Sequence, residues 1–168
     1  NTLNSRFVFL RNPDDKLYNF TERKGYLTLK LRPQTASGKE SPAFIGFRQS
    51  HLQCAAFVEM DFEAVSSKEK AGLLIFQNET HYYFLCKSFE KGDPVVQLIK
   101  SATVTGFDYQ VLASQKLSSN KNIQLRIDAN IDTYSFWFAE KKDKWVLLKD
   151  GVDAKFLSTE VAGGFVGS

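Results

Sequence analysis

The chain has 168 residues, which predicts one domain over residues 1–168, and its 22 basic and 19 acidic residues leave a net charge of +3. Because Lys and Arg are interspersed with Asp and Glu, the sequence holds no basic stripe that would favour a nucleic-acid partner. No apolar run approaches the roughly 20 residues that a membrane-spanning helix needs, so a membrane is not an expected partner either.

Along most of the chain, apolar and polar residues alternate with a period of two, which is typical of strands with one buried face. Residues 26–31, 123–128 and 133–138 follow this pattern, whereas 72–76 and 81–85 are more apolar and predict central strands covered on both faces. Turn sequences separate these stretches at 12–15, 37–39, 77–79, 91–94, 130–132, 142–143 and 150–151. Roughly ten to twelve strands without a long helix predict an all-β fold, a two-sheet antiparallel β-sandwich.

Residues 44–51 place planar hydrogen-bonding groups beside aromatic rings. Arg48, Gln49 and His51 are candidates to bind sugar hydroxyls or to contact a neighbouring domain, since a guanidinium holds its five donors in a rigid fork. The alternative is a strand whose polar side chains anchor adjacent loops.

The two cysteines of the chain, Cys54 and Cys86, each lie in an apolar run that predicts a buried thiol. A disulfide between them would require Cα atoms within about 7 Å of each other. The sequence contains no CxxC motif and no Cys/His cluster at zinc spacing. We therefore predict no metal and no cofactor, and leave a structural calcium ion open.

Three acidic residues alternate in the sequence Glu59-Met60-Asp61-Phe62-Glu63. On a strand, Glu59, Asp61 and Glu63 would share one face, and carboxylates held together raise each other's pKa. This spacing is similar to the E-x-D-x-E signature of laminarinase- and lichenase-type enzymes, in which Glu59 would be the nucleophile and Glu63 the acid/base. A solvated strand face is the alternative, and only two Trp are present to wall a cleft.

Aromatic residues on two of the predicted strands can either fill the core or stack on a pyranose ring. We expect Phe84, Phe136 and Phe138 in the core. Tyr83 and Trp137 have the opposite parity, which makes them candidates for an outward-facing sugar-stacking surface.

The last residues, 162–168, combine a Gly-rich turn with what looks like the start of another strand. A sandwich that ended there would leave a sheet edge unpaired. Either the final strand lies beyond residue 168 or this edge is covered in another way, and we expect the chain to be a fragment or C-terminal module of a larger protein.

Five phrases of the sequence, in the same order, resemble the C-terminal domain of family forty-three glycoside hydrolases, the β-xylosidase and α-L-arabinofuranosidase group. They are Leu10-Arg11-Asn12-Pro13 with 25–29, then 41–51, 71–78, 134–136 and 157–165, and together they cover nearly the whole chain. Phe7 stands where the family tends to have Trp, and Phe47 where it usually has Arg. These departures affect individual contacts rather than the fold.

The resemblance implies a concanavalin A-like jelly roll that is a non-catalytic accessory domain of a larger glycoside hydrolase. In this family the catalytic residues belong to a preceding five-bladed propeller, on which the sandwich packs. Phe165, after the two glycines, would then reach the rim of the active-site pocket, with plant-cell-wall oligosaccharide as the substrate. A stand-alone carbohydrate-binding module and the small endo-glucanase remain alternatives, and a periplasmic or extracellular location is favoured over a cytoplasmic one.

Overall fold

The computed structural model describes residues 2–12, 16–101 and 109–163, and the chain divides into two compact units, Asn1–Ser50 and His51–Ser168. Among its described residues, the first unit has a two-stranded antiparallel sheet of β1 (Tyr18–Asn19) and β2 (Thr28–Leu29) and an isolated antiparallel bridge between Val8 and Gly46. Aromatic rings of this unit also pack on one another: the ring centroids of Phe7 and Phe47 are 4.0 Å apart. The strand predicted over 26–31 is therefore reduced to two residues, because β1 offers a ladder of only two residues.

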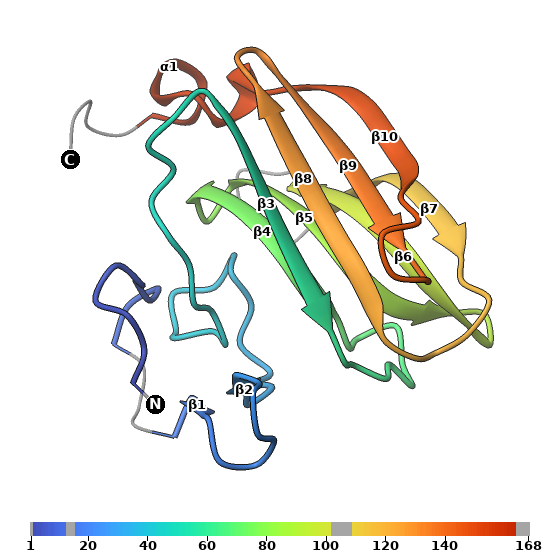
Figure 1. Cartoon of the computed structure of the whole chain (residues 1–168). Coiled ribbons are helices and arrows are strands. Elements are labelled where there is room, and N and C mark those ends of the chain that lie inside the picture. Colours follow the sequence, from blue (N-terminus) through green and yellow to red (C-terminus); the bar gives the residue numbers. More distant parts are fainter. Residues whose placement is uncertain (1, 13–15, 102–108, 164–168) are drawn as a thin grey trace. The chain divides into compact units, whose positions relative to one another are not determined.

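The second unit consists of two four-stranded antiparallel sheets that face each other (Figure 1). The β3 sheet has the order β10-β9-β8-β3, with bounds β3 Gln53–Met60, β8 Ile123–Asn130, β9 Thr133–Ala139 and β10 Val146–Asp153. The β5 sheet has the order β4-β5-β6-β7, with bounds β4 Ala71–Asn78, β5 His81–Glu90, β6 Asp93–Ser101 and β7 Tyr109–Lys116. After β10 the chain forms η1 (Lys155–Leu157) and α1 (Thr159–Ala162). The predicted all-β sandwich is confirmed.

The core lies between the two sheets and is filled by alternate residues of their strands. The β3 sheet contributes Leu125 and Phe136, both fully buried, and the β5 sheet contributes Leu85 and Leu98, also fully buried. These bulky side chains fill the gap of about 10 Å that separates packed sheets. The period-two pattern of residues 123–128 and 133–138 therefore marks β8 and β9 correctly.

Strand β5 is covered on both of its faces, as its apolar sequence predicts. Tyr83 and Leu85 face the core, and Tyr82 and Cys86 on the opposite face are 7% and 0% exposed. Strand β4, in contrast, is an edge strand rather than a central one. At Gly72 it approaches β5 so closely that an added Cβ would overlap the Leu85 carbonyl oxygen, which explains the glycine.

Two other predictions about local structure are wrong. Asp150-Gly151 is not a turn but lies inside β10, where the pairing register shifts between Lys149 and Val152 and Gly151 has φ +62°. Glycine supplies the positive φ that such a bulge needs. Cys54 is exposed, because β3 is an edge strand, and its thiol and that of Cys86 are free on different sheets.

Within the described residues, no helix is long and apolar enough to cross a membrane.

Candidate functional site

The end of the sandwich from which the chain leaves α1 is held by the hairpin between β4 and β5. Asn78 Nδ2 donates to the Ala162 carbonyl oxygen at 2.9 Å, which joins the hairpin to the last residue of α1. The same side chain accepts through Oδ1 from Thr80 N and Thr80 Oγ1, each at 3.0 Å. One Asn therefore forms the hairpin turn and fixes the start of the C-terminal segment.

His81 and Phe156 complete this anchor, which we call the C-terminal anchor (Asn78, Thr80, His81, Phe156 and Ala162). The ring centroids of His81 and Phe156 are 4.8 Å apart, and Lys100 Nζ lies 4.0 Å from the Phe156 centroid. Burial, and then the Lys100 charge, lower the pKa of His81, so its imidazole is neutral at pH 7.

Helix α1 ends at Ala162 and is followed by Gly163, which has a positive φ. The Ser158 side chain caps the helix by accepting from Val161 N at 3.3 Å. Gly163 then has φ +72°, a left-handed conformation that glycine adopts without steric cost. Phe165, the predicted pocket-rim residue, lies outside the described residues.

The three acidic residues of 59–63 do not share one face of a strand, because β3 ends at Met60. Glu59 lies on the outer face of β3 and accepts from Gln124 Nε2 at 3.3 Å. Asp61 and Glu63 are exposed residues of the following loop. The prediction of a shared strand face is therefore wrong.

A small hollow lies beside Glu59, lined also by Gln124 and Glu140, with a volume of about 60 Å³. Ligand pockets usually measure about 300–1,000 Å³. The Glu140 carboxylate is moreover already hydrogen-bonded: its Oε2 accepts from Ser118 N and from Ser118 Oγ, both at 2.6 Å. The geometry gives no support to a glycosidase site around these carboxylates.

Behind this acidic loop, an internal lysine reaches out of the core. Lys87 on β5 is 0% exposed, and its Nζ donates to the carbonyl oxygens of Phe62 and Lys121, each at 2.6 Å. Burial lowers the pKa of Lys87, while Glu63, Asp61 and Glu140 act in the opposite direction. The ammonium therefore holds together two loops at the end of the sandwich opposite the C-terminal anchor.

The remaining predicted site residues do not come together in one site. Arg48, Gln49 and His51 are exposed in the connection between the two units and are not part of a strand. Tyr83 is only 1% exposed and donates its hydroxyl to the Asp153 carbonyl oxygen at 2.9 Å, so the prediction that it faces outward is wrong. Its ring packs in the core, where burial raises its pKa to about 12.

Trp137 does lie on the outer face of the β3 sheet, as its parity predicts. It is paired with Arg126 on β8 and with Leu147 on β10. In the structure's described ranges, no group bonds to its Nε1.

Asn78 and Lys87 were not singled out from the sequence. The signal for Asn78 was its place in a predicted turn followed by Thr80, since Asn side chains often bond to the backbone two residues on. Lys87 gave no signal, because a lysine on a strand is most often solvated.

Over residues 2–12, 16–101 and 109–163, His, Cys, Asp and Glu side chains do not gather in threes as a metal site would require.

Comparison with known proteins gives a match over the whole chain: the family model described as the β-xylosidase C-terminal concanavalin A-like domain matches residues 1–168. The chain is 27% identical over 165 residues to a xylosidase/arabinosidase of Butyrivibrio fibrisolvens. It is 28% identical over 166 residues to a non-reducing end α-L-arabinofuranosidase of Bacteroides ovatus. The alignments cover 98% and 99% of this chain but 31% and 30% of the relatives, so the chain spans about a third of their length.

Solved structures agree. The GH43B protein of the Bacteroides ovatus xyloglucan PUL matches with a TM-score of 0.88 and 28% identity, over 99% of this chain and 32% of that one. The GH43 protein BlXynB of Bacillus licheniformis matches with a TM-score of 0.86 and 24% identity, over 96% of this chain and 30% of that one. The second match is informative about the fold alone, and it agrees with the sandwich described above.

Proposed function

Since this chain belongs to the family of C-terminal concanavalin A-like domains of β-xylosidases, we propose that it packs on the catalytic portion of a longer glycoside hydrolase and shapes that enzyme's active-site pocket. The resemblance found in the sequence is thereby confirmed at the level of the family, an accessory C-terminal domain of GH43 enzymes. The observation that carries the proposal is the coverage: the chain aligns over nearly its whole length with about a third of each relative.

The expected partner is a five-bladed propeller that precedes this domain in the same polypeptide. The expected substrate of the assembled enzyme is an oligosaccharide of the plant cell wall, a β-xyloside or an α-L-arabinofuranoside, as the names of the relatives suggest. We place this enzyme in the periplasm or outside the cell and assign no cofactor to this domain.

The C-terminal anchor supports the pocket-shaping part of the proposal. Asn78 fixes Ala162, and Gly163 follows with a positive φ, so the backbone is held in place up to Gly163. A segment that presents a bulky ring to a neighbouring pocket has to begin from such a fixed point, because loose attachment would cost conformational entropy on docking. Phe165 lies two residues beyond Gly163.

The test begins with the gene that encodes this chain. The proposal expects a catalytic portion encoded before Asn1, and a gene without one would refute it. That portion and the 168-residue chain, produced separately and mixed, should elute together in size-exclusion chromatography, whereas the 168-residue chain alone should hydrolyse neither aryl β-xyloside nor aryl α-L-arabinofuranoside.

Kinetics of the assembled enzyme test the role of the pocket rim. Phe165→Ala should raise KM more than it lowers kcat, because the ring is proposed to contact substrate without taking part in the chemistry. The matched control is Val161→Ala, which shortens an exposed apolar side chain on α1 and should leave both constants unchanged. If Phe165→Ala and the unmodified enzyme have the same KM and kcat, Phe165 does not contact the substrate and this part of the proposal is refuted.

A further inference from the structure

A row of four large side chains crosses the outer face of the β3 sheet, one from each strand. The strand register places Phe57 on β3 opposite Arg126 on β8, then Trp137 on β9 and Leu147 on β10. We call these four residues the aromatic row. Adjacent strands lie about 4.8 Å apart, so the row is about 14 Å long.

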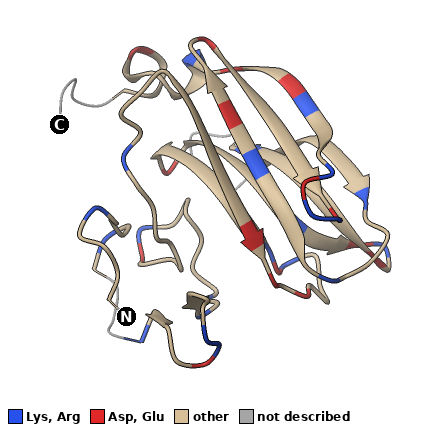
Figure 2. Cartoon of the chain, in the orientation of Figure 1, with Lys and Arg blue, Asp and Glu red and all other residues tan. Residues whose placement is uncertain are grey.

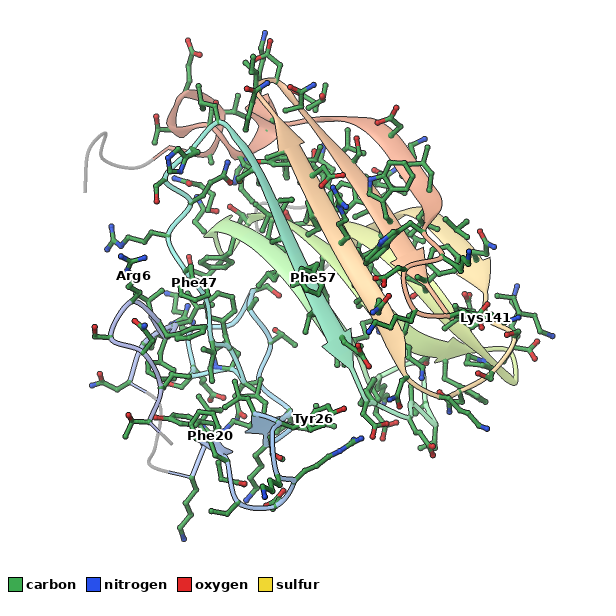
Figure 3. All side chains as sticks on the ribbon, in the orientation of Figure 1. Arg6, Phe20, Tyr26, Phe47, Phe57 and Lys141 are labelled. Atoms are coloured by element: carbon green, nitrogen blue, oxygen red, sulfur yellow. The ribbon has the colours of Figure 1, made fainter. Side chains whose placement is uncertain are left out.

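The row is accessible, unlike the opposite face of the same sheet. Phe57 is 70% exposed and Leu147 42% exposed, and Trp137 is partly exposed, whereas Phe136 and Phe138 next to it are buried in the core. Figure 3 shows the Phe57 side chain on β3. Trp137 and Leu147 are direct neighbours, and Arg126 lies between Trp137 and Phe57. Exposed large apolar side chains grouped on one sheet face mark a binding surface more often than isolated ones do.

Polar groups lie within the row and beside it, and they are already held in place by contacts with one another. Arg126 Nε contacts Asp128 Oδ1 at 2.8 Å, and the Arg126 guanidinium carbon lies 5.9 Å from the centroid of the Trp145 ring. On the next row of the sheet, Gln124 Nε2 donates to Glu59 Oε2. Trp137 Nε1 has no partner within residues 2–12, 16–101 and 109–163, but the atom is buried, so the Trp137 ring offers its apolar surface to a ligand and not this donor.

The charges of this face balance. Figure 2 shows acidic and basic positions side by side on β8 and β10, and Arg126 is paired with Asp128. A nucleic acid would need a basic surface. The centre of a protein interface is usually depleted of Asp and Glu, whereas here Asp128 and Glu59 adjoin the rings. A neutral ligand with many hydroxyl groups, which both donate and accept hydrogen bonds, fits this combination.

We propose that the aromatic row binds a neutral polysaccharide chain, independently of the packing on a catalytic portion. Pyranose rings would stack on Trp137 and Phe57, because their apolar faces match the flat face of an aromatic ring. Hydroxyl groups would bond to the Arg126–Asp128 pair, whose planar groups are oriented by their mutual contact. The open sheet surface suits a chain that extends along it rather than a single sugar enclosed in a pocket.

Binding of xylohexaose to the 168-residue chain, followed by isothermal titration calorimetry and Trp fluorescence, tests this proposal. We expect a dissociation constant of about 1 mM or below, and a loss of affinity of roughly tenfold for Trp137→Ala, which corresponds to about 1.4 kcal/mol. Phe57→Ala should weaken binding by a similar factor and, because its ring is mostly exposed, should leave the fold intact. The matched control is Phe47→Ala, a ring 60% exposed in the first unit, which should bind as the unmodified chain does.

Three outcomes would overturn the proposal. The first is no binding of xylohexaose by the unmodified chain up to about 10 mM. The second is unchanged affinity in Phe57→Ala and Trp137→Ala. The third is that the row serves a protein instead: Phe57→Ala would then weaken co-elution with the catalytic portion while xylohexaose binds to neither form. If the unmodified chain binds xylohexaose but does not elute with the catalytic portion, the proposed packing is refuted and the present proposal stands.

Discussion

Replacement of Lys87 by Met tests how the end of the sandwich opposite the C-terminal anchor is held together. The Lys87 ammonium is buried and donates to the carbonyl oxygens of Phe62 and Lys121. Met has a similar length and fills the same space, but it donates no hydrogen bond. Both carbonyl groups would lose this partner, since the backbone that carries them is unchanged.

The expected loss follows from two opposing contributions. A hydrogen bond from a charged donor stabilises a fold by about 1.5–3 kcal/mol, so two such bonds set an upper limit of about 6 kcal/mol. Removal of the ammonium also removes the cost of its desolvation, which offsets part of that loss. We expect Lys87→Met to lower the free energy of unfolding by about 3 kcal/mol, or the Tm by about 6–12 °C for a chain of this size.

Urea unfolding of the 168-residue chain, followed by circular dichroism and Trp fluorescence, measures this difference. Lys121→Met is the matched control, because the Lys121 side chain is exposed and its carbonyl oxygen is retained, and it should change the free energy of unfolding by less than about 0.5 kcal/mol. If Lys87→Met were as stable as the unmodified chain, or more stable, the two hydrogen bonds would not stabilise the fold and the reasoning would be refuted.

Three further predictions concern other parts of the second unit. Gly72→Ala should lower the free energy of unfolding by about 2 kcal/mol, because its Cβ would overlap the Leu85 carbonyl oxygen; urea unfolding that shows no loss would contradict the close approach of β4 and β5. Asn78→Ala should speed hydrogen exchange of the α1 amides while exposed Gln77→Ala does not, and equal exchange rates would mean that Asn78 does not anchor α1. Burial raises the pKa of Tyr83 to about 12, so its stabilising contribution is complete below pH 10 and is lost as pH rises through about 12. Tyr83→Phe should accordingly lose less stability over that interval in thermal unfolding, and parallel losses would be inconsistent with a buried phenol.

The fold of the second unit was predictable because its strands bury one face each. On β8, Leu125 and Ile127 alternate with polar residues. This alternation predicts both that the segment is a strand and which of its faces packs in the core. The same rule failed for Tyr83, since β5 is buried on both faces and parity then carries no information about exposure. In the first unit, alternation over 26–31 did not produce a long strand, because a strand also needs a partner that the local sequence does not specify.

The candidate sites were less predictable, for a related reason. The role of Lys87 depends on two backbone carbonyl groups, at residues 62 and 121, and backbone groups carry no residue-type signal in the sequence. Asn78 likewise acts on the Ala162 carbonyl oxygen, 84 positions away. The aromatic row was visible only in part: Trp137 had the right parity, but its alignment with Phe57 required the register of three strands.

Strand β5 connects the two ends of the sandwich, and this bears on how the domain can support a neighbour. Tyr83, near its beginning, donates to Asp153 beside η1, and Lys87, further along, binds the loops at the other end. A polar side chain of one central strand therefore fixes each end through backbone carbonyl groups. Such contacts are insensitive to which side chains the loops carry, so loop residues can vary while the loop positions are kept. The GH43B protein of Bacteroides ovatus, at 28% identity, keeps this fold with a TM-score of 0.88 although most of its residues differ, which is what contacts to the backbone permit.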